Sequence, residues 1–306
     1  MIEASAPWPL AGLRFAVAGA GRVGTSLASW LAAAGGELAF AASRSEGSAA
    51  NLCARLGGRA VALSDLDAGG LDLLLVAVPD DAVTPVARTL AAGGRATVTL
   101  HTAGALPASA LAPLGSPAAS FHPLKAFPRP LPDPASARGV VFGLDGDESA
   151  LALAERLLAA WGARGARIPP EHRRLYHFAA TQAAGGVVTL VSLAAELGRR
   201  LGLPAAVAAG YLDLARGALA EVDPERPAAA ITGPVARGDA SAVATALTAL
   251  EREAPDLVPT AVALLAETLR QVSSLTDAAR RALGELLAGP RHVPNLSGTS
   301  EGEGEE

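Results

Sequence analysis

The residues that could do chemistry begin with a glycine-rich turn near the N-terminus. Gly19, Gly21 and Gly24 follow the pattern Gly-x-Gly-x-x-Gly, after an apolar run and before a helix-like segment. In such a strand–turn–helix, the first glycine permits the tight turn and the second lets the backbone approach a pyrophosphate. The third lets helix and strand pack closely. The spacing therefore predicts a dinucleotide site, with the helix N-terminus supplying amide donors.

The kind of dinucleotide is indicated by the end of the second predicted strand. About 20 residues beyond the glycine turn, an NAD-binding protein presents Asp or Glu to the ribose hydroxyls. Here that place reads Ser43-Arg44-Ser45, while Arg22 and Val23 lie inside the turn. An arginine flanked by two hydroxyls offers charged and neutral donors to a 2′-phosphate. The sequence therefore predicts NADP(H) as the cofactor.

Two further polar segments follow predicted strands. Val78-Pro79-Asp80 comes after the fourth apolar run, and Thr102 comes after the next one. Ligands of open α/β sheets bind at the carboxyl ends of the strands, so we expect all four residues in the cofactor site. Asp80 could instead cap the following helix. Thr102 could contact the nicotinamide carboxamide or a substrate.

Reduction of a carbonyl or imine needs a proton or hydrogen-bond donor near the heteroatom that gains charge. Three residues are candidates by type and place: His122 in a proline-rich loop, Lys125 just after it, and His177 on a long predicted helix. His122 could instead only fix its loop. Lys125 is the single lysine among 25 basic residues, so it is either a needed ammonium or an ordinary residue left by a bias towards arginine.

Candidate substrate contacts lie on the helical half of the chain. Tyr176 points roughly 100° away from His177 on a helix, which favours packing or a contact between domains. Thr181 lies one turn from His177 on the same face. Arg237 could bind a substrate carboxylate. Alternatively, Arg237 pairs with Asp239, for which we predict a role as N-cap of the helix that follows.

No metal site is predicted. The chain has one cysteine, Cys53, and its five histidines show no ligand spacing with carboxylates. A single cysteine also fits a reducing compartment, and no signal peptide is recognised, so we expect a cytoplasmic protein. The net charge of −5 leaves no basic field for nucleic acid. A small-molecule substrate is the expected partner.

The elements that must position these residues change character along the chain. Strands alternate with helices up to about residue 168, which predicts an α/β domain with a doubly wound parallel sheet. Helices dominate beyond that, over about 171–201, 204–221, 239–253, 256–272 and 275–288. We therefore predict a Rossmann dinucleotide-binding domain over 1–168 and an all-α substrate and dimerisation domain over 169–290. A disordered tail is predicted over 291–306.

One helical stretch raises a membrane question. Residues 178–195 are uncharged for 18 positions but include Thr, Gln, Ser and two Gly residues. A helix that is apolar all round also suits a protein core or a dimer interface. We expect a buried helix of a soluble protein and no membrane.

Several motifs together resemble a bacterial family that pairs a Rossmann-like oxidoreductase domain with a C-terminal helical domain of unknown function. These motifs are the glycine turn with Ser43-Arg44-Ser45, Val78-Pro79-Asp80, His122-Pro123-Leu124, Tyr176-His177 and Thr232-Gly233-Pro234-x-x-Arg237-Gly238-Asp239. The resemblance covers residues 12–290. The architecture is similar to that of ketopantoate reductase and pyrroline-5-carboxylate reductase, whose C-terminal domains resemble that of 6-phosphogluconate dehydrogenase.

The resemblance implies NADPH-dependent reduction of a small, ketopantoate-like oxo acid or a cyclic imine, by hydride transfer in a cleft between domains. It also implies a homodimer formed through the helical domain. The proton-donating lysine of related reductases is missing, because no lysine follows Lys125, and Gly185 or Gly186 replaces an expected Asn. Two alternatives therefore remain: hydride exchange between NADPH and a deazaflavin, and a non-catalytic NADP(H) sensor.

Overall fold

A computed structural model describes residues 10–289 of the 306-residue chain. The tail predicted for 291–306 lies outside the described residues. Contacts between Cα atoms divide the chain into two compact units, the first ending at Gly186 and the second beginning at Val187. The division falls at the end of a π-helical turn, Gln182–Gly186.

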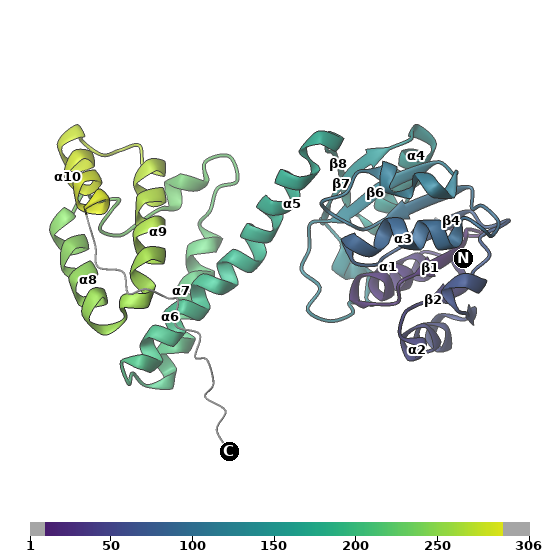
Figure 1. The fold of residues 1–306 in the computed structure, drawn as a ribbon, viewed down its shortest axis with the longest axis horizontal. Coiled ribbons are helices and arrows are strands. Elements are labelled where there is room, and N and C mark those ends of the chain that lie inside the picture. Colours follow the sequence, from purple (N-terminus) through teal and green to yellow (C-terminus); the bar gives the residue numbers. More distant parts are fainter. Residues whose placement is uncertain (1–9, 290–306) are drawn as a thin grey trace, which may run out of the picture. The chain divides into compact units, whose positions relative to one another are not determined.

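The first unit is built on one eight-stranded sheet (Figure 1). Its strands lie in the order β3-β2-β1-β4-β5-β6-β7-β8. They are β1 Arg14–Ala18, β2 Glu37–Ala42, β3 Arg59–Ala60, β4 Leu73–Val76, β5 Val98–His101, β6 Ala118–Pro123, β7 Val141–Gly146 and β8 Arg164–Arg167. The predicted fold class is confirmed, and the strand order reverses between β1 and β4, where ligands of such sheets bind.

One strand pair departs from the predicted parallel sheet. β6 and β7 are antiparallel, whereas every other neighbouring pair is parallel. A parallel pair needs a crossover connection, usually a helix. The proline-rich segment between β6 and β7 forms only a short 3₁₀ turn, Pro134–Ala137, so the chain returns beside β6 in the opposite direction.

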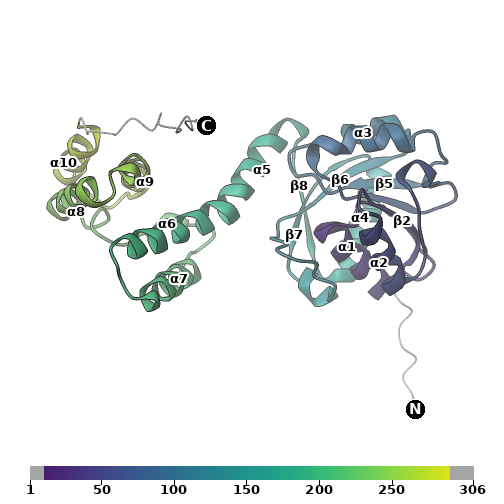
Figure 2. The same cartoon turned by 60° about the horizontal axis from the view of Figure 1, so that its bottom comes forward.

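Helices cover both faces of the sheet, with α3 on one face and α1, α2 and α4 on the other (Figure 2). Their bounds are α1 Arg22–Ala33, α2 Glu46–Leu56, α3 Asp80–Leu90 and α4 Glu148–Trp161. Alternate side chains of β1 serve the two layers: Phe15 and Val17 join one buried cluster, and Ala16 and Ala18 join the other.

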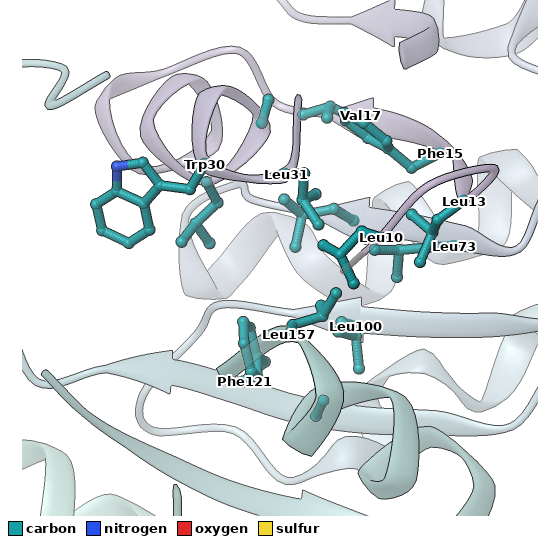
Figure 3. Close-up of a cluster of buried hydrophobic side chains, with 14 of the residues drawn as sticks. Leu10, Leu13, Phe15, Val17, Trp30, Leu31, Leu73, Leu100, Phe121 and Leu157 are labelled. Carbon is teal, nitrogen blue, oxygen red and sulfur yellow. The ribbon is translucent and has the colours of Figure 1, made fainter. Parts of the chain in front are cut away.

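The larger of the two clusters holds most of the buried aromatic rings (Figure 3). Trp30 of α1 lies edge-on to Trp161 of α4, with ring centroids 5.5 Å apart. The ring centroids of Phe121 in β6 and Phe142 in β7 lie 4.5 Å apart, and both rings contact Trp161. These contacts fix the end of β6, where His122 follows Phe121.

A long helical run covers Pro170–Arg200 and includes α5, Arg173–Thr181, and α6, Val187–Arg200. By length and composition alone it is apolar enough to cross a membrane. None of its apolar window is buried within the described chain, so the helix does not belong to the core of a single chain, and its burial in a dimer interface stays a prediction. The apolar side chains of this run are half-buried or exposed.

The second unit contains only helices among its described residues, which confirms the predicted helical half. After α6 come α7 Ala205–Ala220, α8 Ala240–Glu253, α9 Val258–Gln271 and α10 Asp277–Ala288. Val243 and Leu247 of α8 pack with Leu269 of α9 and Leu283 of α10 in a small core. Asp239 accepts a hydrogen bond from the Ala242 amide at 2.9 Å, so it caps α8 as the sequence predicted.

Candidate functional site

A pocket of about 1220 Å³ lies at the carboxyl ends of β1, β2 and β4, in the first unit. Eight of the predicted cofactor residues line it: Gly19, Gly21, Arg22, Ser43, Arg44, Ser45, Val78 and Pro79. The rest of its wall comes mainly from small apolar residues of α2, the segment after β3, and α3. The pocket therefore combines polar strand ends with an apolar wall suited to a flat ring.

The three glycines of the turn differ in what surrounds them. A Cβ on Gly19, whose φ is +107°, would lie 2.3 Å from the Ala77 carbonyl oxygen. A Cβ on Gly24 would lie 1.9 Å from the Gly19 carbonyl oxygen, whereas a Cβ on Gly21 would meet nothing within 4 Å. The fold itself requires glycine at positions 19 and 24. At position 21 the absence of a side chain only keeps space open in front of α1.

The Ser43–Ser45 segment presents free donors at the pocket. Arg44 is exposed, and within residues 10–289 its guanidinium has no hydrogen bond or ion pair. Ser45 occupies the N-cap position of α2, but its hydroxyl makes no capping hydrogen bond. One acidic residue, Asp81 of α3, also lines the pocket. A single free cation beside two hydroxyls matches the donors that a phosphate monoester requires.

Four predicted cofactor residues are not among those that line the pocket: Val23, Gly24, Asp80 and Thr102. Val23 packs against the larger core cluster, and Gly24 is buried. Asp80 is the first residue of α3, and its carboxylate accepts a hydrogen bond from the Ala105 amide at 3.3 Å. It therefore ties the loop after β5 to α3 and does not cap the helix. Thr102 is half-buried, just after β5.

A second group of polar side chains, which we call the histidine cluster, joins β6 to α5. It consists of His122, Tyr176 and His177. The Nδ1 atom of His122 lies 2.8 Å from the Tyr176 hydroxyl. The His122 and His177 rings meet edge to face, with centroids 5.3 Å apart. The structure therefore brings two of the three predicted proton donors together, and adds Tyr176 as their partner.

Gly104, in the loop after β5, makes this arrangement possible. A Cβ at this position would lie 2.2 Å from Nδ1 of His177 and 2.8 Å from Nε2 of His122. The Nδ1 atom of His177 is buried and has no hydrogen-bond partner in the described part of the chain. Gly143 of β7 leaves similar room, since a Cβ there would lie 2.4 Å from the Tyr176 hydroxyl. Because neither glycine has a side chain, Tyr176 and His177 can lie close to the sheet.

Burial determines the charge of the cluster. Burial, together with the neighbouring His177, Arg173 and His101, lowers the pKa of His122 to about 4. His122 is therefore neutral at pH 7. Burial also raises the pKa of the Tyr176 phenol, which stays protonated. At neutral pH His122 and Tyr176 are thus neutral hydrogen-bonding groups.

His101, at the end of β5, has a structural role. Burial lowers its pKa to about 4. The Ala103 amide donates to its Nδ1 at 3.2 Å, so Nε2 carries the proton and lies 3.1 Å from the Pro107 carbonyl oxygen. Both ring nitrogens are used, which leaves neither for a ligand.

A buried ion pair anchors α5 to the sheet. Arg173, at the start of α5, has no exposed surface and pairs through Nε with Asp145 of β7. Its Nη2 donates to the Gly143 carbonyl at 3.2 Å. The other oxygen of Asp145 accepts from the Ala108 amide at 2.7 Å. The pair therefore links β7, α5 and the segment that follows the Gly104 loop.

Sequence reasoning missed four residues that build the cluster: Gly104, Gly143, Asp145 and Arg173. The only sign of them in the sequence is Asp145, an acidic residue that directly follows the apolar strand residues ending at Leu144. An acid at such a place must find a partner when it is buried. The sequence does not say which of 24 arginines provides it.

The remaining predicted site residues are not members of the histidine cluster. Lys125 is half-buried, and no described side chain bonds to its ammonium group. Thr181 is exposed, and its hydroxyl donates to the Phe178 carbonyl at 2.7 Å. Arg237 is exposed in the second unit. Within residues 10–289, no group of three or more His, Cys, Asp or Glu side chains is placed to hold a metal ion.

Two protein families each match part of the chain. Residues 5–128 match the Rossmann-like domain family. Residues 140–264 match a domain of unknown function, DUF2520. No curated protein matches the sequence.

Several solved structures have a similar fold, and each match covers nearly the whole of the solved chain. A protein from Thermotoga maritima is 25% identical, with a TM-score of 0.69, over 85% of this chain and 98% of its own. A candidate NADP oxidoreductase from Bacteroides fragilis is 22% identical, with the same TM-score and coverage. The 1-pyrroline-5-carboxylate reductase of Streptococcus pyogenes is 17% identical, with a TM-score of 0.56, over 86% of this chain and 98% of its own. The chain therefore combines a Rossmann-like domain with a DUF2520 helical domain, as the resemblance of its motifs predicted.

Proposed function

We propose that the protein is an NADPH-dependent oxidoreductase that reduces a small oxo acid or a cyclic imine. The observation that carries this proposal is the free Arg44 between Ser43 and Ser45 in a pocket that also contains the glycine turn. An NAD-binding pocket would present an acid at that place. The name of the similar Bacteroides fragilis protein, a candidate NADP oxidoreductase, supports the same cofactor.

The residues of the pocket fit the parts of NADP(H) in turn. The open space at Gly21 and the N-terminus of α1 suit the pyrophosphate, because free backbone amides and the helix dipole favour an anion there. Arg44 and its two flanking hydroxyls suit the 2′-phosphate. The apolar wall of the pocket, which includes Ala60 and Val61, suits the adenine ring. When bound, the cofactor supplies the hydride.

The histidine cluster fits the second requirement of a reductase, a donor for the heteroatom that becomes negative. β4, β5 and β6 are parallel, so their carboxyl ends share one edge of the sheet. His122 and Gly104 therefore lie on the same edge as the pocket. An imidazole N–H of His122 or His177 would donate to that heteroatom. The absence of any bond from Lys125 to the cluster makes the lysine the weaker candidate.

The substrate class rests on the likeness of the fold to pyrroline-5-carboxylate reductase, which acts on a cyclic imine.

NADPH oxidation should be followed with a panel of oxo acids, cyclic imines and a deazaflavin. We expect turnover with at least one oxo acid or imine. Turnover with the deazaflavin alone would replace the proposal with cofactor-to-cofactor exchange. Tight NADPH binding without any turnover would make the protein a sensor.

We further propose that a second copy of the chain covers the apolar surface of α6 and α7. Val188 of α6 is 65% exposed and Leu214 of α7 is 71% exposed, within a unit whose own core lies among α8, α9 and α10. Large apolar side chains exposed in this way are typical of a protein–protein interface. Sedimentation should give twice the mass of one chain, and Leu214→Glu should return it to a monomer. A monomeric wild type would contradict the proposal.

A further inference from the structure

Arg173 is the only fully buried arginine among the described residues. Its guanidinium contacts three groups at once. Nε pairs with Asp145, Nη2 donates to the Gly143 carbonyl, and the charged group lies 5.7 Å from the centre of the Tyr176 ring. A buried charge must have such partners to be tolerated. The side chain therefore cannot move without losing contacts on both β7 and α5.

Tyr176 lies three residues after Arg173, on the same side of α5. Its hydroxyl is 2.8 Å from Nδ1 of His122, and among the described residues this nitrogen is the only acceptor to which the phenol is hydrogen-bonded. The protonated phenol therefore has no other acceptor for its proton in the described part of the chain, so it donates that proton to Nδ1. A neutral imidazole has one acceptor nitrogen and one N–H. When the phenol donates to Nδ1, the proton of His122 must be on Nε2.

The Nε2 atom is the one that faces the loop at Gly104 and His177. We propose that Arg173, anchored by Asp145, is a positioning residue that holds Tyr176 in place and so fixes His122 in its Nε2–H tautomer. The proposal rests on the proposed function in one respect: this tautomer gives His122 the N–H that would be offered to a substrate heteroatom. The tautomer itself can be measured without any substrate.

The charged or titratable groups that act on His122 come from two elements: His101 from β5, and Arg173, Tyr176 and His177 from α5. Asp145 of β7 is the ion-pair partner of Arg173. His101 already uses both ring nitrogens, and Asp145 is occupied by Arg173 and the Ala108 amide. Among the described residues, only the Tyr176 hydroxyl is hydrogen-bonded to Nδ1 of His122. Tyr176 is therefore the group through which Arg173 acts.

The test is nitrogen NMR of the full chain labelled in its histidine rings, at pH 7. The signal of His122 is identified by its loss in His122→Asn. We expect the wild type to show a single Nε2–H tautomer for His122. Tyr176→Phe removes the donor and should give a mixture of both tautomers. Arg173→Lys keeps the charge but not the planar group, and should give the same mixture.

Two further variants keep the test decisive. Arg174→Lys changes the exposed neighbouring arginine and should leave the wild-type tautomer. If Arg173→Lys does not fold, the double variant Asp145→Asn/Arg173→Gln replaces the ion pair with two neutral amides and should also give the mixture. A wild-type proton on Nδ1 would overturn the proposal, as would an unchanged tautomer in the folded Arg173 variants.

Binding of NADPH separates this proposal from the proposed function. None of Asp145, Arg173 or Tyr176 lines the dinucleotide pocket. We therefore expect all of these variants to bind NADPH like the wild type. If the tautomer changes as expected but the wild type never binds NADPH, the proposed function fails and the positioning role stands. If NADPH binds and the tautomer does not change, the positioning role fails alone.

Discussion

The dinucleotide pocket and the histidine cluster lie on the same edge of one sheet but are built in opposite ways. The pocket comes from strand ends and helices between residues 19 and 86, and its cation, Arg44, is exposed and free. The cluster joins β6, β7, α5 and the loop after β5, and its cation, Arg173, is fully buried and paired. Substitutions in the pocket should therefore weaken ligand binding, whereas substitutions in the cluster should lower the stability of the fold.

The same contrast applies to the glycines. In the pocket, Gly21 faces open space, whereas in the cluster Gly104 and Gly143 face side chains of α5 at less than 3 Å from where a Cβ would lie. A glycine in the pocket thus leaves room for a ligand. A glycine in the cluster leaves room for the protein itself.

Removal of one buried charge should have the largest effect on stability. Asp145→Ala leaves Arg173 unpaired, so we expect the free energy of unfolding to fall by about 3–5 kcal/mol. Arg44→Met at the pocket should change it by less than about 0.5 kcal/mol, because the side chain is exposed. Urea unfolding of both variants measures the difference. Similar losses in the two variants would remove the distinction between the regions.

The glycine turn offers a contrast within the pocket. Gly24→Ala places a methyl group against the Gly19 carbonyl and should lower the free energy of unfolding by about 1–3 kcal/mol. Gly21→Ala should fold normally, since its φ of −78° suits alanine and the space is open. It should nevertheless weaken NADPH binding, because the methyl group lies where the pyrophosphate is expected. Normal NADPH binding by Gly21→Ala would place the pyrophosphate elsewhere.

Arg44→Ala tests the charge of the pocket. We expect the dissociation constant for NADPH to rise about 10- to 100-fold, the value of one charge-assisted contact to phosphate. The constant for NADH should not change. Arg55→Ala, an exposed arginine in the last turn of α2 outside the pocket, is the matched control. An equal loss for NADPH and NADH would show that Arg44 does not contact a 2′-phosphate.

The cluster also predicts a pH dependence of stability. The pKa values of His101 and His122 are lowered from 6.5 to about 4 by burial. As the pH falls, these two histidines therefore bind protons in the unfolded chain before they do so in the folded chain. Their contribution to the free energy of unfolding is thus complete above pH 6.5 and is lost towards pH 4. The slope should be roughly 1 kcal/mol per pH unit for each histidine.

Urea midpoints between pH 7 and pH 4 measure this slope. His122→Asn should reduce it, whereas replacement of the exposed His172 by Asn should not. A slope that is the same in both variants and the wild type would mean that His122 is not desolvated.

The glycine turn and the Ser43–Ser45 segment could be predicted because each is a local pattern with a fixed place in a strand–turn–helix. The alternation of strands and helices likewise predicted the sheet, since each element shows its own periodicity. The antiparallel β7 was missed because the direction of a strand leaves no mark on its own residues.

The cluster could be predicted only in part. His122 and His177 were singled out by residue type, but their meeting depends on Gly104, and their support depends on a pair 28 residues apart, Asp145 and Arg173. Neither arginine nor glycine stands out in a chain with 33 glycines and a strong arginine bias. Lys125 did stand out by composition, yet rarity of a residue type carries no information about its contacts.

We infer that the pocket holds the cofactor while the cluster supplies the donor. The rate of NADPH oxidation by His122→Asn, relative to the wild type at saturating NADPH, tests this division of roles. Asn keeps an acceptor for Tyr176 but lacks Nε2, so we predict a rate lower by about 100-fold or more with unchanged NADPH affinity. An unchanged rate, or a loss of rate that follows a loss of NADPH affinity, would contradict the account.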